Sequence, residues 1–126
     1  MEKKFLVCEI CGNVGSLIID KGIELHCCGT EMQEVKANST DAATEKHVPI
    51  VEKTAKGVKV TVGSVMHPME ASHLINHIYV QTDKGGYGKD LVAGEQPVVE
   101  FDLNGETPVA VYEYCNLHGL WVTEVK

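Results

Sequence analysis

GVKVTVG, residues 57–63, is the stretch that decides the fold of the larger part of this chain. Its three valines alternate with Lys59 and Thr61. Because successive side chains of a strand point to opposite faces, the valines share one face and the polar side chains share the other. This period of two predicts a strand that is buried on one side.

The alternation continues towards the C-terminus in VVEFDL at 98–103 and PVAVYEY at 108–114, while HLINHIYVQ at 73–81 alternates less cleanly. The residues expected on the buried side of the first two stretches are Val99, Phe101, Leu103, Val109 and Val111. Glycine- and proline-containing turn signals, KGG, AGEQP and LNGETP, separate these runs. Short strands joined by such turns, without a helical period, predict an all-β fold of the antiparallel sandwich or barrel type.

The N-terminal part of the chain has a different character. Residues 1–36 are rich in cysteine and glycine, and ANSTDAATE at 37–45 is small and polar. A segment below about 40 residues usually needs a metal or disulfides to fold, because its apolar core is too small. We therefore predict a small metal-stapled domain at 1–36, a linker at 37–45 and a β domain at 46–126.

Composition narrows the class of function. The 126 residues carry a net charge of −7, and every basic side chain other than histidine is a lysine. Nucleic-acid binding usually requires a basic face, so we expect no nucleic-acid partner. No apolar run approaches the roughly 20 residues that span a bilayer, and MEKKFLVCEICG does not resemble a signal peptide, so we expect no membrane association and a cytoplasmic location. In that compartment, clustered cysteines are more often metal-binding or redox-active than disulfide-bonded.

Four of the five cysteines form one set near the N-terminus: Cys8, Cys11, Cys27 and Cys28. Four thiolates suit a tetrahedral ion, either zinc or iron. Gly12 follows the CxxC pair and predicts a tight knuckle, whereas the adjacent second pair should distort the tetrahedron. The open alternatives are a structural zinc, an iron that carries one electron, disulfides and free thiols.

The fifth cysteine, Cys115, lies three residues before His118 in CNLHG, a spacing typical of metal ligands. The chain has six histidines: His26, His47, His67, His73, His77 and His118. Four imidazoles and one thiolate would give five donors and leave one octahedral position open. Iron suits this donor set and can change valence, which favours one-electron oxygen chemistry.

Other interpretations of these residues stay open at this point. Cys115 and His118 could form a nucleophilic pair, although no orienting third group or oxyanion hole is evident. Cys115 could also be an inert buried thiol. His77 would share a strand face with His73, and His26 is adjacent to Cys27, so either could be a ligand.

Taken together, the motifs resemble those of the desulfoferrodoxins, the two-domain form of superoxide reductase. The matching stretches are the CxxC and CC pairs, STDAATEKHVP, GSVMHPMEASH and EYCNLHGLW. The resemblance implies a desulforedoxin-like, rubredoxin-like FeS4 domain followed by an immunoglobulin-like antiparallel β-sandwich with a second mononuclear iron. It implies that this iron is held by His47, His67, His73 and His118 in a plane and by Cys115 on the axis.

The same resemblance leaves His26 and His77 outside the ligand set. Two positions depart from the family pattern, Met66 where proline is common and Leu120 where histidine is common. Neither is a ligand position, so we expect a retuned pocket rather than a loss of activity.

The resemblance also implies a function: one-electron reduction of superoxide to hydrogen peroxide, without release of dioxygen. Lys46 would attract the anion and hold a water that delivers a proton, and Glu45 would occupy the sixth position of the ferric iron. A rubredoxin-like donor would restore ferrous iron, and the chain would be a homodimer. The alternatives are a non-catalytic electron carrier, a zinc-stapled binding protein or a dismutase.

Overall fold

The GVKVTVG stretch forms the central strand of a three-stranded antiparallel sheet in the computed structural model, which describes residues 3–39, 44–65 and 67–126. This strand is β7 (Gly57–Val62), and it lies between β6 (Pro49–Lys53) and β10 (Val98–Asp102). All three of its valines are fully buried, as the alternation predicts. The pairing of Val60 with Val51 and with Val99 sets the register on the two sides.

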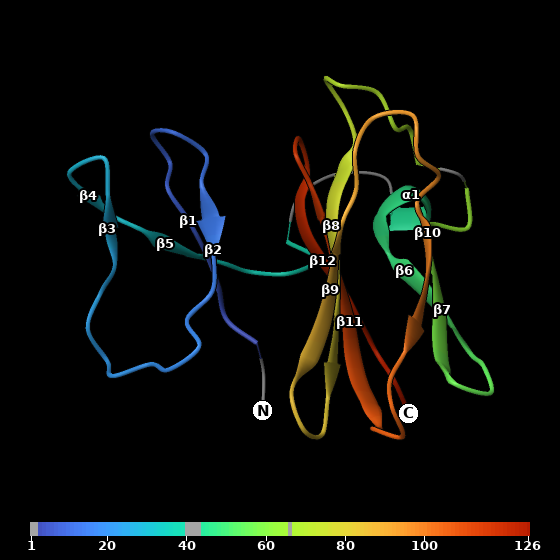
Figure 1. The fold of residues 1–126 in the computed structure, drawn as a ribbon. Helices are drawn as coiled ribbons and strands as arrows, with labels where there is room; N and C mark the ends of the chain where they lie inside the picture. The colour runs from blue at the N-terminus through green and yellow to red at the C-terminus, as the bar shows by residue number, and fades with distance from the viewer. Residues whose placement is uncertain (1–2, 40–43, 66) are drawn as a thin grey trace. The chain divides into compact units, whose positions relative to one another are not determined.

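A four-stranded antiparallel sheet forms the other layer (Figure 1). Its order is β12 (Gly119–Glu124), β11 (Pro108–Cys115), β8 (Ile75–Thr82) and β9 (Gly86–Asp90). The two sheets contribute buried side chains to one core, which includes Val58, Val60, Val62, Ile75, Ile78, Val80, Phe101, Val111 and Cys115. The predicted all-β sandwich is therefore confirmed.

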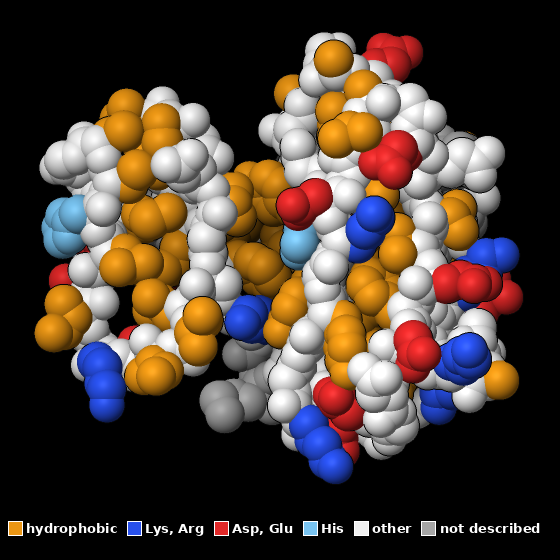
Figure 2. Space-filling view, in the orientation of Figure 1, with side chains coloured by type: hydrophobic (Ala, Val, Ile, Leu, Met, Phe, Trp, Pro, Cys, Tyr) orange, Lys and Arg blue, Asp and Glu red, His pale blue; other side chains and the backbone are white. Residues whose placement is uncertain are grey.

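Contacts within the chain divide it into two units, residues 1–36 and 37–126. The first unit has a three-stranded sheet of β2 (Val14–Gly15), β1 (Phe5–Val7) and β5 (Gln33–Val35), and a hairpin of β3 (His26–Cys27) and β4 (Thr30–Glu31). Its strands are only two or three residues long, and several large apolar side chains are exposed, as Figure 2 shows on one face. The exposed ones are Ile10, Val14, Ile18, Ile19, Ile23 and Leu25. Such a unit has little hydrophobic core of its own.

One helix, α1 (Thr44–His47), is present among the described residues. It precedes β6 and spans the predicted boundary between the linker (37–45) and the β domain (46–126). No break in secondary structure marks that boundary, which stays a prediction. Figure 1 shows α1, the connection from β7 to β8 and the turn from β11 to β12 at the same end of the sandwich. Within the described ranges, no helix has the length and apolar character that crossing a membrane requires.

The prediction that Val109 joins Val111 in the core is wrong, because Val109 is 39% exposed whereas Val111 is fully buried. The pairing of β11 with β8 shifts register between Pro108 and Ala110. Such an irregularity interrupts the strict alternation of side chains between faces. A period-two pattern read from sequence cannot include this shift.

Candidate metal centres

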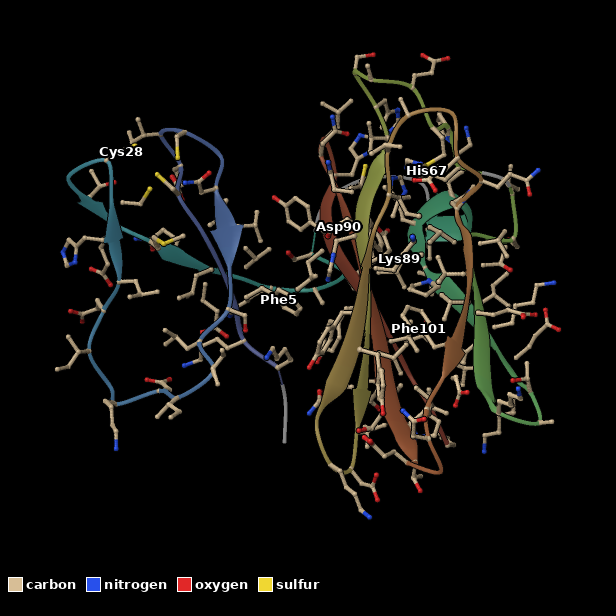
Figure 3. All side chains as sticks on the ribbon, viewed as in Figure 1. Phe5, Cys28, His67, Lys89, Asp90 and Phe101 are labelled. Atoms are coloured by element: carbon tan, nitrogen blue, oxygen red, sulfur yellow. The ribbon has the colours of Figure 1, made fainter. Side chains whose placement is uncertain are left out.

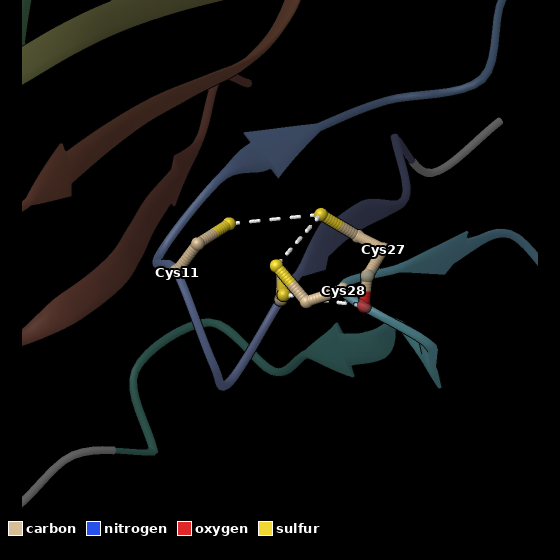
Figure 4. Close-up of side chains that lie close together, drawn as sticks. Cys11, Cys27 and Cys28 are labelled. Atoms are coloured by element: carbon tan, nitrogen blue, oxygen red, sulfur yellow. Dashed lines mark hydrogen bonds between the residues drawn. The ribbon is translucent and has the colours of Figure 1, made fainter.

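The four N-terminal cysteines converge on one point in the first unit. Their sulfur atoms all lie within 4.8 Å of one another. Cys27 Sγ is 3.6 Å from Cys11 Sγ and 4.0 Å from Cys28 Sγ, and Figure 4 shows these three side chains turned towards one another. A tetrahedral ion with metal–sulfur bonds of about 2.3 Å separates its ligands by about 3.8 Å. The cluster therefore has the dimensions of a four-sulfur metal centre.

Local backbone conformation explains how these sulfurs meet. Gly12 has a φ of 83°, and its N–H donates to the Cys8 carbonyl at 2.8 Å, which closes the knuckle after CxxC. Cys28 adopts a φ of 55°, a left-handed conformation that is uncommon for residues other than glycine. This conformation changes the direction in which Cys28 leaves the chain relative to Cys27, so two adjacent cysteines can serve one centre.

The protonation of these thiols also fits a bound cation. The backbone N–H of Cys11 lowers the pKa of Cys8 to about 6. Hydrogen bonding to the Cys11 sulfur raises the pKa of Cys28 to about 12. Four thiolates cannot be held together at neutral pH without a positive charge, and a metal ion supplies that charge.

All five cysteines lie in the described part of the chain, and none of them forms a disulfide. The disulfide alternative is therefore wrong for the N-terminal set.

The second cluster draws its donors from three segments of the larger unit: α1, the connection from β7 to β8 and the β11–β12 hairpin. His47 ends α1, and His67 lies in the connection from β7 to β8 (Figure 3). His73 lies just before β8, Cys115 ends β11, and His118 lies in the turn that leads into β12. The β11–β12 hairpin brings Cys115 and His118 together, since Cys115 pairs with Gly119.

The four imidazoles form a nearly square arrangement. Ring centroids of neighbours are between 4.7 and 5.0 Å apart, with interplanar angles between 78° and 88°. His47 and His73 lie across one diagonal at 6.4 Å, with their planes at 29°. Each ring is thus turned nearly edge-on to its neighbours, so that ring nitrogens face the middle of the square.

The distances between donor atoms match those around one ion. His47 Nε2 lies 3.2 Å from His67 Nε2 and 3.0 Å from His118 Nδ1. Metal–nitrogen bonds of about 2.1 Å at right angles would separate adjacent donors by about 3.0 Å. Cys115 Sγ is 3.5 Å from His67 Nε2 and 4.0 Å from His118 Nδ1.

The hydrogen bonds of the ring nitrogens indicate that the cluster can bind a metal. His73 Nε2 is a buried atom without a hydrogen-bond partner among the described residues. His67 Nδ1 lies 2.6 Å from the Pro68 carbonyl oxygen, which can only accept, so the proton is on Nδ1 and the Nε2 lone pair faces the cluster. Burial lowers the pKa of His67 to about 4, which keeps the ring neutral and able to bind a metal.

Cys115 is fully buried, and burial raises the pKa of its thiol, whereas the backbone N–H groups of Leu117 and His118 lower it. A buried sulfur is a poor nucleophile for a substrate that must reach it, which counts against the Cys–His nucleophile. The converging imidazoles likewise count against an inert buried thiol. The arrangement can hold one ion through five donors.

Of the remaining predicted residues, the structure describes the side chains of Lys46 and Leu120, and neither is a donor of the two clusters. Lys46 is exposed in α1, next to His47. The side chain of Glu45 and all of Met66 lie outside the described part of the chain. The predictions about these two residues therefore stay predictions. Strand alternation puts Leu120 on the opposite face of β12 from Trp121.

The two ambiguous histidines have other surroundings. His26 is exposed in β3, and it is not among the four grouped donors of the first unit. His77 lies on β8, and its Nδ1 is 2.7 Å from an oxygen of Asp90 on β9. His73 precedes β8 rather than lying on it, so the two histidines do not share a strand face.

Three residues around the second cluster were not predicted. Trp121 stacks on His47 at 5.0 Å and donates from Nε1 to the His118 carbonyl. The Asn116 side chain forms hydrogen bonds with the backbone of Ser72 and Leu74, the two neighbours of His73. Glu113 is buried between the sheets, two residues before Cys115. The period of two along β11 could have indicated Glu113. Asn116 and Trp121 lie in the EYCNLHGLW stretch, but that motif did not predict their contacts.

Comparisons with known proteins agree with this geometry. The family model described as Desulfoferrodoxin matches residues 39–124. The desulfoferrodoxin of Nitratidesulfovibrio vulgaris is 48% identical over 117 residues, covering 93% of this chain and 92% of that protein. A superoxide reductase of Pyrococcus furiosus is 32% identical, covering 69% of this chain and 92% of its own length. The crystal structure of the superoxide reductase from Treponema pallidum aligns with a TM-score of 0.82 and 35% identity, covering 98% of this chain and 100% of that chain.

Proposed function

Because the chain belongs to the desulfoferrodoxin family, we propose that it is a superoxide reductase with two mononuclear iron centres. The reaction consumes one superoxide, one electron and two protons and yields one hydrogen peroxide, so it releases no dioxygen. The observation that carries this proposal is the square of four imidazoles with Cys115 beside it. A closed zinc site would need only four donors.

The catalytic iron would be held by His47, His67, His73, His118 and Cys115. Ferrous iron bound there supplies the electron that reduces superoxide. The protein orients the donors: the Pro68 carbonyl fixes the tautomer of His67, and Trp121 packs against His47. Burial of Cys115 keeps other reactants away from its sulfur.

The four-sulfur cluster of Cys8, Cys11, Cys27 and Cys28 would hold the other iron and act as a one-electron centre. We assign it to a domain at 1–36, joined by a linker at 37–45 to the catalytic domain at 46–126. Sulfur separations of 3.6 and 4.0 Å support the assignment of this cluster.

Lys46 and Glu45 are assigned to the handling of substrate and product. Lys46 is exposed and adjacent to the ligand His47, and superoxide is an anion approaching a chain with a net charge of −7. A local cation raises the concentration of an anion near the site and can hold a water that donates a proton. Glu45 would bind the ferric iron once the product has left.

The surroundings of the enzyme are part of the same proposal. Each turnover needs one external electron, for which we assign a rubredoxin-like donor. We place the protein in the cytoplasm, where reduced cysteines persist, and none of its five cysteines is in a disulfide. The exposed apolar side chains of the first unit, Ile18 and Ile23 among them, support a homodimer.

The test combines metal analysis with superoxide kinetics on protein prepared without added metal. We expect about two irons per chain and stoichiometric oxidation of the reduced protein by superoxide, with hydrogen peroxide formed and no dioxygen evolved. Dioxygen evolution would indicate a dismutase instead. Zinc in both centres, or iron without reaction with superoxide, would leave a structural or electron-carrying protein as the better account.

A further inference from the structure

Two short stretches of the chain, the turn at 70–73 and the stretch at 115–118, carry three of the five donors of the second centre. His73 lies in one segment, and Cys115 and His118 lie in the other. The two segments are about forty residues apart in sequence, so local geometry alone does not set their separation. Their relative position must come from contacts between them.

Asn116 makes those contacts. Its Oδ1 accepts from the N–H of Leu74 at 2.9 Å, and its Nδ2 donates to the carbonyl of Ser72 at 3.1 Å. Its own N–H donates to the carbonyl of Leu74 at 3.2 Å. Ser72 and Leu74 are the two neighbours of His73, and Asn116 is the neighbour of Cys115. These hydrogen bonds therefore hold the backbone on both sides of one donor to the residue next to another.

The regular sheet provides only part of this link, through the Cys115–Ile75 pair and the backbone hydrogen bond from Asn116 to Leu74. The pairing of β11 with β8 shifts register between Tyr114 and Cys115, where Tyr114 pairs with His77 and Cys115 with Ile75. A register shift interrupts the ladder of backbone hydrogen bonds locally. The Asn116 side chain bridges the strands immediately beyond this interruption.

The segment on the other side is preformed. Glu70 and His73 exchange two backbone hydrogen bonds, each of 3.0 Å, which close a tight turn. Because its own backbone hydrogen bonds close that turn, His73 is held rigidly within it. The hydrogen bonds of Asn116 therefore position His73 and the turn together. The spacing between His73 and Cys115 then depends on the Asn116 side-chain amide in addition to the Cys115–Ile75 pairing and the backbone hydrogen bond to Leu74.

We propose that Asn116 is a positioning residue that sets the distance between Cys115 and His73, and thereby the iron affinity and the thiolate spectrum of the second centre. This inference rests on the proposed function, because it takes iron as the ion of that centre. Outer residues that orient metal ligands typically change metal affinity by about 10–100-fold when they are altered.

A matched pair of variants tests the proposal. Asn116→Asp keeps the acceptor for Leu74 and loses the donor to Ser72. Asn38→Asp is the control, because Asn38 makes the same two-sided amide contact to the backbone of Val122, accepting at 2.9 Å and donating at 3.2 Å. Both variants lose one donor and gain one negative charge. Asn116→Ala removes both side-chain hydrogen bonds without adding charge.

The measurement is loss of iron from each holoprotein to a ferrous chelator, followed by the absorbance of each centre. For both Asn116 variants we expect the second centre to lose iron to about 10–100-fold less chelator, with a shifted ferric–thiolate band. The four-sulfur centre of the same molecules, and both centres of Asn38→Asp, should be unchanged.

The proposal is overturned if the Asn116 variants hold the second iron as tightly as the wild type with an unshifted band. It is also overturned if Asn38→Asp loses that iron equally, since the effect would then be general destabilisation. Superoxide reduction by the wild type is measured in parallel. An inactive wild type whose second iron still depends on Asn116 would refute the proposed function and leave the positioning role intact.

Discussion

Cys115 is the side chain on which the second centre most depends, because it is the only sulfur donor described there. Cys115→Ser should abolish superoxide reduction and the ferric–thiolate absorbance of that centre. A serine hydroxyl lacks the soft, electron-rich sulfur that the proposed iron site uses as a ligand. The absorbance of the four-sulfur centre should persist in the same sample. Full activity in this variant would contradict the ligand assignment.

Lys46 tests the role of positive charge next to the ligand His47. Lys46→Ala should slow the reaction with superoxide by up to about tenfold at low salt and weaken its dependence on ionic strength, because one attracting charge is lost. The measurement is the second-order rate constant by pulse radiolysis or stopped flow across a salt series. The control is Lys56→Ala, which removes an exposed lysine from the turn at the other end of β6 from His47. Equal rates and salt slopes for the two variants would remove Lys46 from the mechanism.

At the scale of single elements, β11 is unusual for a core strand because it buries an acidic side chain and a proposed metal ligand. It places Val111, Glu113 and Cys115 on its buried side. Glu113 is 1% exposed, and neither of its carboxylate oxygens has a hydrogen-bond partner among the described residues. Burial raises its pKa to about 9, so the folded protein keeps a proton there that the unfolded chain releases near pH 4.5.

The sign of the resulting pH dependence follows from this proton. Between about pH 4.5 and 9 the folded state binds more protons at Glu113 than the unfolded state, so the free energy of unfolding falls as pH rises. The slope from this one group is at most about 1.4 kcal/mol per pH unit. Glu113→Gln cannot ionise and should flatten the decline, as measured by urea unfolding between pH 5 and pH 8. Glu100→Gln, in an exposed position on β10, is the control and should leave the slope as it is.

Element by element, the sequence predicts strands well where one face is uniformly apolar. β7 follows its pattern because Val58, Val60 and Val62 are all buried and no bulge interrupts the strand. β11 departs from its pattern at Val109 because a register shift against β8 lies between Pro108 and Ala110. Bulges depend on the partner strand, so the sequence of one strand does not contain them.

At the scale of the whole molecule, the two units rely on different sources of stability. The larger unit has a core from two sheets, whereas the first unit, in its described residues 3–36, has five strands of two or three residues and several exposed isoleucines. Burial of apolar area contributes about 25 cal/mol per Å², so a unit that leaves such side chains exposed gains little from it. Beside its short strand pairings, we therefore expect a bound ion to be a main source of stability in the first unit.

Cys28→Ser should therefore destabilise the first unit selectively. We expect amide protons of β1, β2 and β5 to lose protection in hydrogen exchange, while those of β7, β8 and β11 keep theirs. Glu31→Gln, an exposed change on β4 of the same unit, is the control and should alter neither set. Unchanged protection in β1 after loss of the four-sulfur absorbance would mean that the metal is not what holds this unit together.

The sequence by itself determined the all-β class, the four-sulfur set and the family, because these depend on local alternation and on short motifs whose spacing is contained in one stretch. It left His26 and His77 undecided when the residues alone were considered, and it did not indicate the contacts of Asn116 and Trp121 or the left-handed conformation of Cys28. Only the tertiary structure decided those, by pairing His77 with Asp90 and by joining the Cys115 segment to the His73 segment. The physical reason is that a metal centre is defined by distances between segments that are remote in the chain. Such distances are set by strand register, bulges and side-chain hydrogen bonds, none of which has a period in the sequence.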